Sequence, residues 1–291
     1  MLKILRLPMT APMPELPEVE ISCRGIAPTL QNQTILGATC RTPKLRWPLD
    51  PGLPSILSGR RIISVKRRAK YILVECQAEH SHTGWLIIHL GMSGSLRILP
   101  STTQEQTLTT HDHFDLILPQ KVLRYRDPRR FGSLLWHAEA DIETHPLLRQ
   151  LGPEPLSPYF NGSGLHSALF KRTSPIKPVL MDSQLVVGIG NIYAAESLFR
   201  AGISPLRAAN KINRNDCDQL VLHIQQTLEA AIAAGGSSVR DYVHSDGGIG
   251  CFQLESAVYN RAGMPCLRCG ASIQKIRQTG RSTFYCASCQ H

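Results

Sequence analysis

The sequence predicts an α+β protein of several domains, in which a helix and an antiparallel β-sandwich precede a helical domain and a small cysteine-rich tail. Three observations predict this fold class: apolar residues at helical spacing after residue 15, short branched segments over residues 35–137, and two Cys-x2-Cys pairs near the end. A chain of 291 residues with 42% hydrophobic content is long enough to bury more than one core.

The first helix is expected directly after the segment PMPELPEVE, residues 12–20. Its apolar stripe is made by Leu16, Val19, Cys23, Ile26 and Leu30. Pro17 suits a first helical position, and carboxylates near the start of a helix favour the positive end of its dipole. Glu15 and Glu18, one turn apart, are therefore interpreted as surface dipole partners, although with Lys70 they would also permit general acid–base chemistry.

Seven short segments predict the strands of the sandwich, because they are rich in branched residues and separated by Gly, Pro or polar turns. They are RIISVK, YILVEC, WLIIHL, LRIL, FDLIL, VLRYR and GSLLWH, all within residues 35–137. The pattern is typical of antiparallel strands.

The segment LGPEPLSPYFNGSG, residues 151–164, holds three prolines and three glycines and is interpreted as a linker. Beyond it the pattern is helical again, with an apolar stripe made by Cys217, Leu220, Val221, Ile224, Leu228 and Ile232. Gly235 is expected to end that helix. These boundaries predict domains over residues 13–150, 165–260 and 261–291.

The tail carries a strong metal-binding pattern. Two Cys-x2-Cys pairs, sixteen residues apart, are formed by Cys266, Cys269, Cys286 and Cys289. Four thiolates at this spacing predict one structural Zn²⁺ that holds two strands turning at Thr279 and Gly280. Unrelated cysteines or two disulfides are the alternative. The basic residues of this hairpin suit a phosphate backbone, although a protein-binding finger is also open.

The charge of the chain favours a polyanionic partner. Its net charge is +10, and the excess is clustered: residues 60–70 carry six basic side chains and no acid, residues 121–130 carry five against one acid, and residues 256–291 carry five and no acid. Such clusters favour nucleic-acid phosphates, although a merely basic surface is the alternative. No apolar run approaches ~20 residues, so no membrane segment is expected. Nine cysteines, five of them scattered, predict a reducing, cytoplasmic setting.

A set of motifs in order along the chain carries a resemblance to a known family. They are MPELPEVE, RRAKY, IIHLGMSGSLRI, HDHFDL, YRDPRRFG, LGPEPL, VGIGNIYAAESLF and the four-cysteine tail. From Met13 to the C-terminus the sequence closely resembles bacterial formamidopyrimidine-DNA glycosylases. The resemblance implies a β-sandwich domain, a helix–two-turns–helix domain and a zinc finger, with damaged double-stranded DNA held between them by a monomer. It also implies removal of oxidised purines.

The resemblance assigns the catalytic residues. Pro14 would be the nucleophile, Glu15 the proton donor and acceptor at the sugar, and Glu18 a supporting carboxylate. Lys70 and Arg281 would donate protons in β- and δ-elimination. Asn191 would join Arg281 in clamping the lesion phosphate, although Asn191 also suits a plain N-cap.

The resemblance also implies the DNA contacts. Met92 and Phe131 would fill the space left by a flipped base and Arg129 would contact the orphaned cytosine; without the resemblance, Met92 and Phe131 read as core residues. The other implied DNA contacts are His111, Lys171, Arg172 and Lys177. HDH alone would equally suit a metal pair or two core histidines. The Gly-rich segment 244–252 is expected to be a mobile loop over the flipped base.

One departure from the family pattern concerns Pro14, which is preceded by thirteen residues. A proline nitrogen within a chain is a tertiary amide with no lone pair free to attack. Residues 1–12 are therefore expected to be a non-native extension, with translation starting at Met13, and proteolytic trimming is the competing explanation. Two other functions stay open: excision of oxidised pyrimidines, as in endonuclease VIII-like enzymes, and non-catalytic DNA binding with Pro14 permanently blocked.

Overall fold

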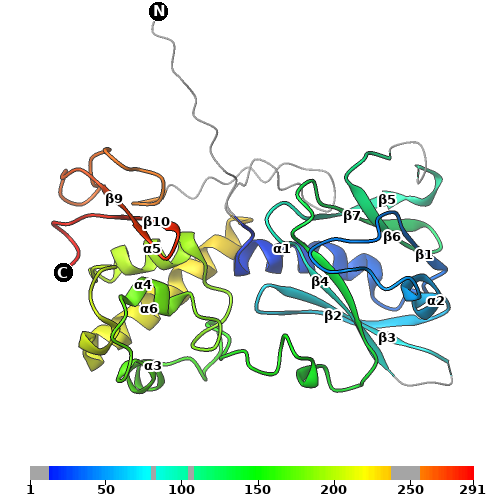
Figure 1. The fold of residues 1–291 in the computed structure, drawn as a ribbon, viewed down its shortest axis with the longest axis horizontal. Coiled ribbons are helices and arrows are strands. Elements are labelled where there is room, and N and C mark those ends of the chain that lie inside the picture. Colours follow the sequence, from blue (N-terminus) through cyan, green and yellow to red (C-terminus); the bar gives the residue numbers. More distant parts are fainter. Residues whose placement is uncertain (1–12, 80–82, 104–107, 237–255) are drawn as a thin grey trace, which may run out of the picture.

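The computed structural model describes residues 13–79, 83–103, 108–236 and 256–291. In Figure 1 the strands of the two large sheets gather in one lobe, and most helices gather in the other with the C-terminal hairpin. The first helix starts at the junction and runs into the strand-rich lobe (Figure 1). The predicted α+β fold class is confirmed.

Helix α1 (Leu16–Leu30) begins where the sequence predicts, with Glu15 as its N-cap. Pro17 is its second residue rather than its first. The predicted apolar stripe is buried, and all but its first residue pack into the core of the sandwich. The helix thereby anchors its own N-terminal end at the boundary between the lobes.

The sandwich consists of two four-stranded antiparallel sheets. One contains, in spatial order, β1 (Gly37–Cys40), β6 (Asp112–Ile117), β7 (Lys121–Arg126) and β5 (Ser95–Pro100). The other contains β2 (Arg61–Arg68), β3 (Tyr71–Gln77), β4 (Gly84–His89) and β8 (Ser133–His137). All seven predicted strands are present. The pattern missed β1 and the short helix α2 (Leu53–Leu57), because four half-buried residues and a five-residue turn of helix show no periodicity.

In the part of the chain that the structure describes, the second lobe contains four α-helices. They are α3 (Gly162–Leu169), α4 (Ile176–Leu180), α5 (Asn191–Arg200) and α6 (Arg214–Ala233). Helix α3 starts inside the expected linker, because the side chain of Asn161 caps it by accepting the N–H of Gly164 at 2.9 Å. Gly235 follows α6 with a φ of +83° and ends it as predicted. Within the described ranges, no helix is both long and apolar enough to cross a membrane.

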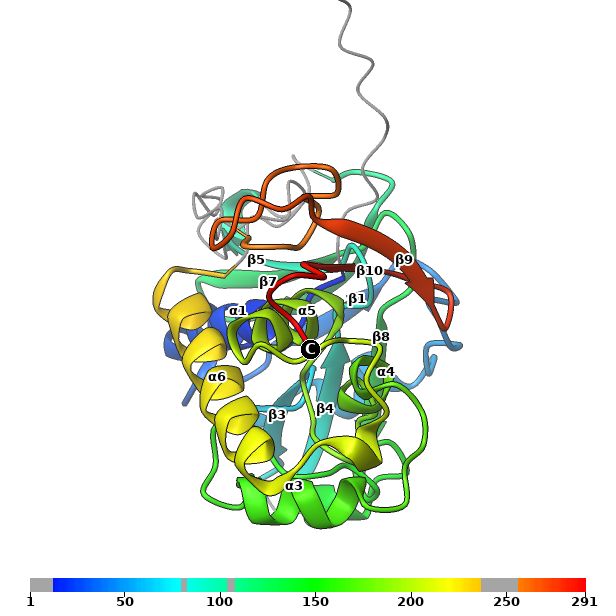
Figure 2. The ribbon, with the colours of Figure 1, turned by 90° about the vertical axis from the view of Figure 1, so that its left-hand side faces the viewer.

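Strands β9 (Gln274–Gln278) and β10 (Arg281–Tyr285) form the C-terminal hairpin. Thr279 and Gly280 both have positive φ, as a two-residue hairpin turn requires. Figure 2 shows β10 next to α5, and a small apolar cluster joins Phe284 and Cys286 to Phe199 of that helix. Helix α5 therefore lies between the hairpin and the rest of its lobe.

A network of ion pairs joins the two lobes behind Lys70. Arg67 contacts Glu20 of α1 and Glu154 of the segment after the sandwich, at 2.6 Å each. Glu154 also accepts the backbone N–H of Ala69 at 2.7 Å and the guanidinium of Arg68 at 3.1 Å. Part of the first basic cluster is therefore paired inside the protein, so its charge does not all face a partner.

Candidate active site

The carboxylate of Glu15 links the start of α1 to the start of α5. Glu15 is 2% exposed and accepts the backbone N–H groups of Gly190, Ile192 and Tyr193 at 2.8, 2.9 and 3.3 Å. These are N–H groups that a helix start leaves without intrahelical partners. Gly190 is required here, because a Cβ on it would lie 2.2 Å from Cδ of Glu15. The side chain next to Pro14 is thus held by the other lobe.

Glu18 lies directly beside this contact. Its carboxylate accepts the N–H of Glu15 at 2.9 Å and the hydroxyl of Tyr193 at 2.7 Å, and only 1% of Glu18 is exposed. The interpretation of the two glutamates as surface dipole partners is therefore wrong. Tyr193 was not predicted, although it lies two residues after Asn191 in the same motif. Pro14, the residue before Glu15, is also buried.

Lys70 faces the two glutamates from the turn between β2 and β3. Its Nζ donates to the carbonyl of Ile189 at 3.4 Å. Burial lowers the pKa of Lys70, which Glu15 opposes and Arg281 reinforces. Burial likewise raises the pKa of Glu15, and Lys70 opposes that shift. The pKa of the amine is lowered and the pKa of the carboxyl is raised, so both shift toward neutral pH. Such shifts suit groups that transfer protons.

Lys177 and Asn191 form a second polar cluster against β10. The Nζ of Lys177 donates to Oδ1 of Asn191 at 2.5 Å and to Oγ1 of Thr283 at 2.9 Å, and burial lowers the pKa of Lys177 to about 8. The Nδ2 of Asn191 donates to the carbonyl of Ser282 at 3.0 Å. Gly190, not Asn191, is the N-cap of α5. The side-chain amide of Asn191 therefore has no capping role.

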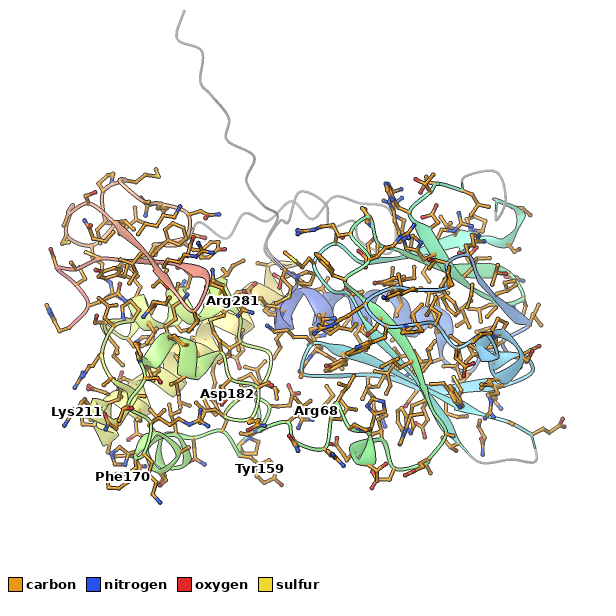
Figure 3. All side chains as sticks on the ribbon, viewed as in Figure 1. Arg68, Tyr159, Phe170, Asp182, Lys211 and Arg281 are labelled. Atoms are coloured by element: carbon orange, nitrogen blue, oxygen red, sulfur yellow. The ribbon has the colours of Figure 1, made fainter. Side chains whose placement is uncertain are left out.

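Arg281 stands next to this cluster on β10. Its side chain is exposed, and Figure 3 places it where the hairpin approaches the start of α1. Its charge lowers the pKa of both Lys70 and Lys177. The structure therefore brings Glu15, Lys70 and Arg281 to one place from three distant parts of the chain.

Two turns of the sandwich carry Met92, Arg129 and Phe131. Met92 follows β4 and is half-buried, whereas Arg129 and Phe131 follow β7 and are exposed. The guanidinium of Arg129 lies 5.1 Å from the ring centroid of Phe131, and 46% of Phe131 is exposed. Phe131 is therefore not a core residue.

The two histidines of HDH differ in their surroundings. His113 is 2% exposed and its Nε2 lies 2.9 Å from the carbonyl oxygen of Asp127, so it is a core histidine. His111 is half-buried, and its carbonyl accepts the N–H of Asp127 at 2.9 Å. Among the described residues, the one group that could hold a metal is the set of four cysteines.

Lys171 and Arg172 lie apart from these clusters. They follow α3, which lies at the opposite end of the helical lobe from the hairpin (Figure 1). Lys171 is exposed, and Arg172 pairs with Asp182 at 2.7 Å. The segment 244–252 lies outside the described residues.

The four cysteines of the tail meet in space. The Sγ atoms of Cys266, Cys269, Cys286 and Cys289 all lie within 4.8 Å of one another, and none forms a disulfide. Tetrahedral Zn–S bonds of about 2.3 Å place sulfur atoms about 3.8 Å apart. The Cys266–Cys289 and Cys269–Cys286 separations, 3.9 and 3.5 Å, fit this geometry. The site thus suits one structural Zn²⁺.

Three regions of the chain match family models. Residues 13–134 match the formamidopyrimidine-DNA glycosylase N-terminal domain, residues 151–243 match the formamidopyrimidine-DNA glycosylase H2TH domain, and residues 263–291 match a zinc finger found in FPG and IleRS.

Comparison of the full chain with whole proteins and solved structures indicates the same family. The chain is 56% identical to a formamidopyrimidine-DNA glycosylase of Dechloromonas aromatica and 49% identical to one of Ralstonia nicotianae, each covering 96% of this chain and 100% of the relative. The MutM (Fpg) structure of Thermus thermophilus has a TM-score of 0.82 at 37% identity, covering 95% of this chain and 98% of that one. A complex of Lactococcus lactis Fpg with abasic-site DNA has a TM-score of 0.85 at 33% identity, covering 95% and 99%. The chain belongs to the formamidopyrimidine-DNA glycosylase family.

Proposed function

We propose that this protein excises oxidised purines from double-stranded DNA and then cleaves the strand at the abasic site, with Pro14 as the nucleophile. The observation that carries the assignment of the site is the meeting of Glu15 and Lys70 next to Pro14, at the junction of the two lobes. Two groups with opposed pKa shifts at such a junction are typical of acid–base catalysis.

The proposed reaction begins at the nitrogen of Pro14. Its lone pair forms a bond to C1′ of the damaged nucleotide, the glycosidic bond breaks with its electrons going to the base, and the N–H proton of Pro14 passes to the departing base. Glu15, whose pKa is raised by burial in favour of its protonated form, gives a proton to the sugar ring oxygen as that oxygen leaves C1′. The product is an iminium between Pro14 and the opened sugar.

Elimination follows from the iminium, which acidifies the neighbouring C–H bond of the sugar. Loss of that proton expels the 3′ phosphate, and a second elimination expels the 5′ phosphate, leaving a one-nucleotide gap. Lys70 and Arg281 face this point and are assigned as proton donors in the two steps. Glu18 supports Glu15 by fixing its backbone N–H.

The remaining residues are assigned to DNA. Asn191 and Arg281 would hold the lesion phosphate, and Lys177, held against both β10 and Asn191, adds positive charge. Met92 and Phe131 would fill the vacated stack, and Arg129 would contact the orphaned base. His111, Lys171 and Arg172 are assigned to phosphates farther along the duplex. One chain would act on one lesion, in the cytoplasm where the chromosome is found.

The active form is proposed to begin at Pro14. Only a proline with no preceding residue has a secondary amine, whose pKa of ~8 leaves part of it neutral near pH 7. The family model likewise starts its match at Met13. Removal of a methionine at that position exposes the amine.

The function is tested with duplexes carrying either 8-oxoguanine opposite cytosine or an oxidised pyrimidine. The chain is expected to excise 8-oxoguanine faster and to leave ends with phosphates on both sides of the gap. Faster excision of the oxidised pyrimidine would favour the endonuclease VIII-like alternative. Binding of either duplex without strand cleavage, by protein shown by mass to begin at Pro14, would favour a non-catalytic DNA-binding protein.

Removal of the metal is expected to abolish activity by releasing the hairpin that carries Arg281. The apolar cluster under the hairpin is small, so the zinc–thiolate bonds supply most of its stability. Cys286→Ser should lower the zinc content measured by a chromogenic chelator and weaken DNA binding at least about tenfold. Cys40→Ala, at a half-buried cysteine of β1, is the matched control. Full zinc content and unchanged DNA affinity in the Cys286→Ser variant would contradict the expectation.

A further inference from the structure

Asp127 occupies a central position beneath the turns that carry Met92, Arg129 and Phe131. Its side chain is fully buried. Oδ1 accepts the hydroxyl of Ser93 at 2.6 Å and the N–H of Arg129 at 3.2 Å. Oδ2 accepts the N–H of Gly132 at 2.8 Å and the hydroxyl of Tyr125 at 3.1 Å. One carboxylate thus accepts four hydrogen bonds: two come from its own turn, one comes from Tyr125 of β7, and the one from Ser93 crosses to the turn that carries Met92.

The backbone of Asp127 extends the same connection to a third turn. Its N–H donates to the carbonyl of His111 at 2.9 Å, and its carbonyl accepts from the ring of His113 and from the N–H of Arg130. Arg130 has a positive φ of 55°, a conformation that a non-glycine residue keeps only when its surroundings hold it. The turns that carry Met92, Arg129, Phe131 and His111 are therefore all hydrogen-bonded to one buried residue.

Close packing leaves the two turns that carry Met92, Arg129 and Phe131 little freedom to move. A Cβ on Gly132 would lie 1.8 Å from the hydroxyl of Tyr125, and a Cβ on Gly91 would lie 2.4 Å from the backbone N of Gly132. The two turns therefore touch through backbone as well as through Asp127. Side chains that enter the base stack must be held rigidly, because a displacement of about 1 Å at a positioned group can lower a reaction rate about 100-fold.

We propose that Asp127 is a positioning residue for base eversion: it fixes Met92, Arg129 and Phe131 in the geometry that enters the DNA stack, and it takes no part in the chemistry at Pro14. This inference rests on the proposed function. It predicts that loss of the carboxylate slows excision of a base that must be flipped out, while cleavage at a sugar that already lacks its base is kept.

Asp127→Asn tests the proposal, since the amide keeps the shape but presents an NH2 group to donors. Each carboxylate oxygen accepts one backbone N–H, from Arg129 or from Gly132, and a backbone N–H cannot reverse its direction. One of these two hydrogen bonds is therefore lost in the variant, which loosens the turn that carries Arg129 and Phe131. Single-turnover excision of 8-oxoguanine opposite cytosine is expected to fall about 100-fold, while strand cleavage at a preformed abasic site changes little. A 2-aminopurine next to the lesion should lose the fluorescence rise that reports unstacking.

Two further variants and the wild-type protein complete the test. Asp216→Asn breaks a partly exposed ion pair with Arg207 on the far lobe and serves as the matched control. Ser93→Ala removes one of the four hydrogen bonds. It should lower the ratio of the rate of 8-oxoguanine excision to the rate of cleavage at a preformed abasic site, and this test remains if the Asp127→Asn variant fails to fold. Equal losses on both substrates, or no loss on either, overturn the inference. Wild-type protein inactive on both substrates would instead overturn the proposed function.

Discussion

Protein that begins at Pro14 is expected to form a covalent adduct with 8-oxoguanine DNA under borohydride, whereas the chain beginning at Met1 is expected to form none. In the longer chain the nitrogen of Pro14 is an amide, whose lone pair is delocalised into the carbonyl of Met13. Borohydride reduces an iminium but leaves an amide unchanged. Trapping therefore reports directly on a free amine at this position.

The experiment compares two chains that differ only in residues 1–13. Intact mass establishes each N-terminus, and peptide mapping locates the adduct. Strand cleavage by the Met1 chain should fall to background while DNA binding is kept, since the zinc finger and the turns of the sandwich are the same in both. An adduct on Lys70 or on another lysine, or cleavage by a chain shown to retain Met1, would contradict the assignment of Pro14.

The pH dependence of trapping gives a second check on the same amine. An α-amine has a pKa of ~8, so its neutral fraction falls about tenfold for each pH unit below that value. The rate of adduct formation is expected to fall on the acidic side accordingly. A rate that does not change between about pH 5 and pH 8 would argue that another group attacks.

The elements with regular periodicity could be predicted from the sequence because their signals are local. Helix α6 shows a six-residue apolar stripe and a glycine immediately after its end. The hairpin of the tail is indicated by Thr279 and Gly280 between two cysteine pairs, and all four thiols converge. Helix α3 begins earlier than expected, because Asn161 caps a helix within a segment that looks like a linker.

The burial of Glu15 and Glu18 could not be predicted from their neighbours in sequence. The groups that surround their carboxylates, Gly190 and Tyr193, lie 175 residues farther along the chain. The role of Asp127 was hidden for a related reason. In the motif YRDPRRFG it looks like a lone acid among basic residues, and only the folded turns show that it accepts four hydrogen bonds.

Glu15→Gln is expected to lower the rate of base excision by about 10²–10⁴-fold, which is the range that a positioned general acid supplies. The amide is the same size, and its oxygen can keep the N–H groups of Gly190 and Tyr193. Its NH2 group then faces the N–H of Ile192, so the variant should fold but unfold at a lower temperature than wild type. The lost function is the proton that Glu15 gives to the sugar. Thermal unfolding of the variant, compared with that of wild type, separates this loss from a structural defect.

The pH profile of the same variant distinguishes an acid from a merely structural carboxylate. Burial raises the pKa of Glu15, so the protonated form persists above the usual range and is lost as pH rises through that higher pKa. Wild-type excision should therefore fall on the alkaline side. The amide of the Glu15→Gln variant does not titrate, so residual activity should keep the acidic limb set by Pro14 and lose the alkaline limb set by Glu15. A variant that retains both limbs would show that a different group donates the proton, with Lys70, whose pKa is lowered by burial, the nearest candidate.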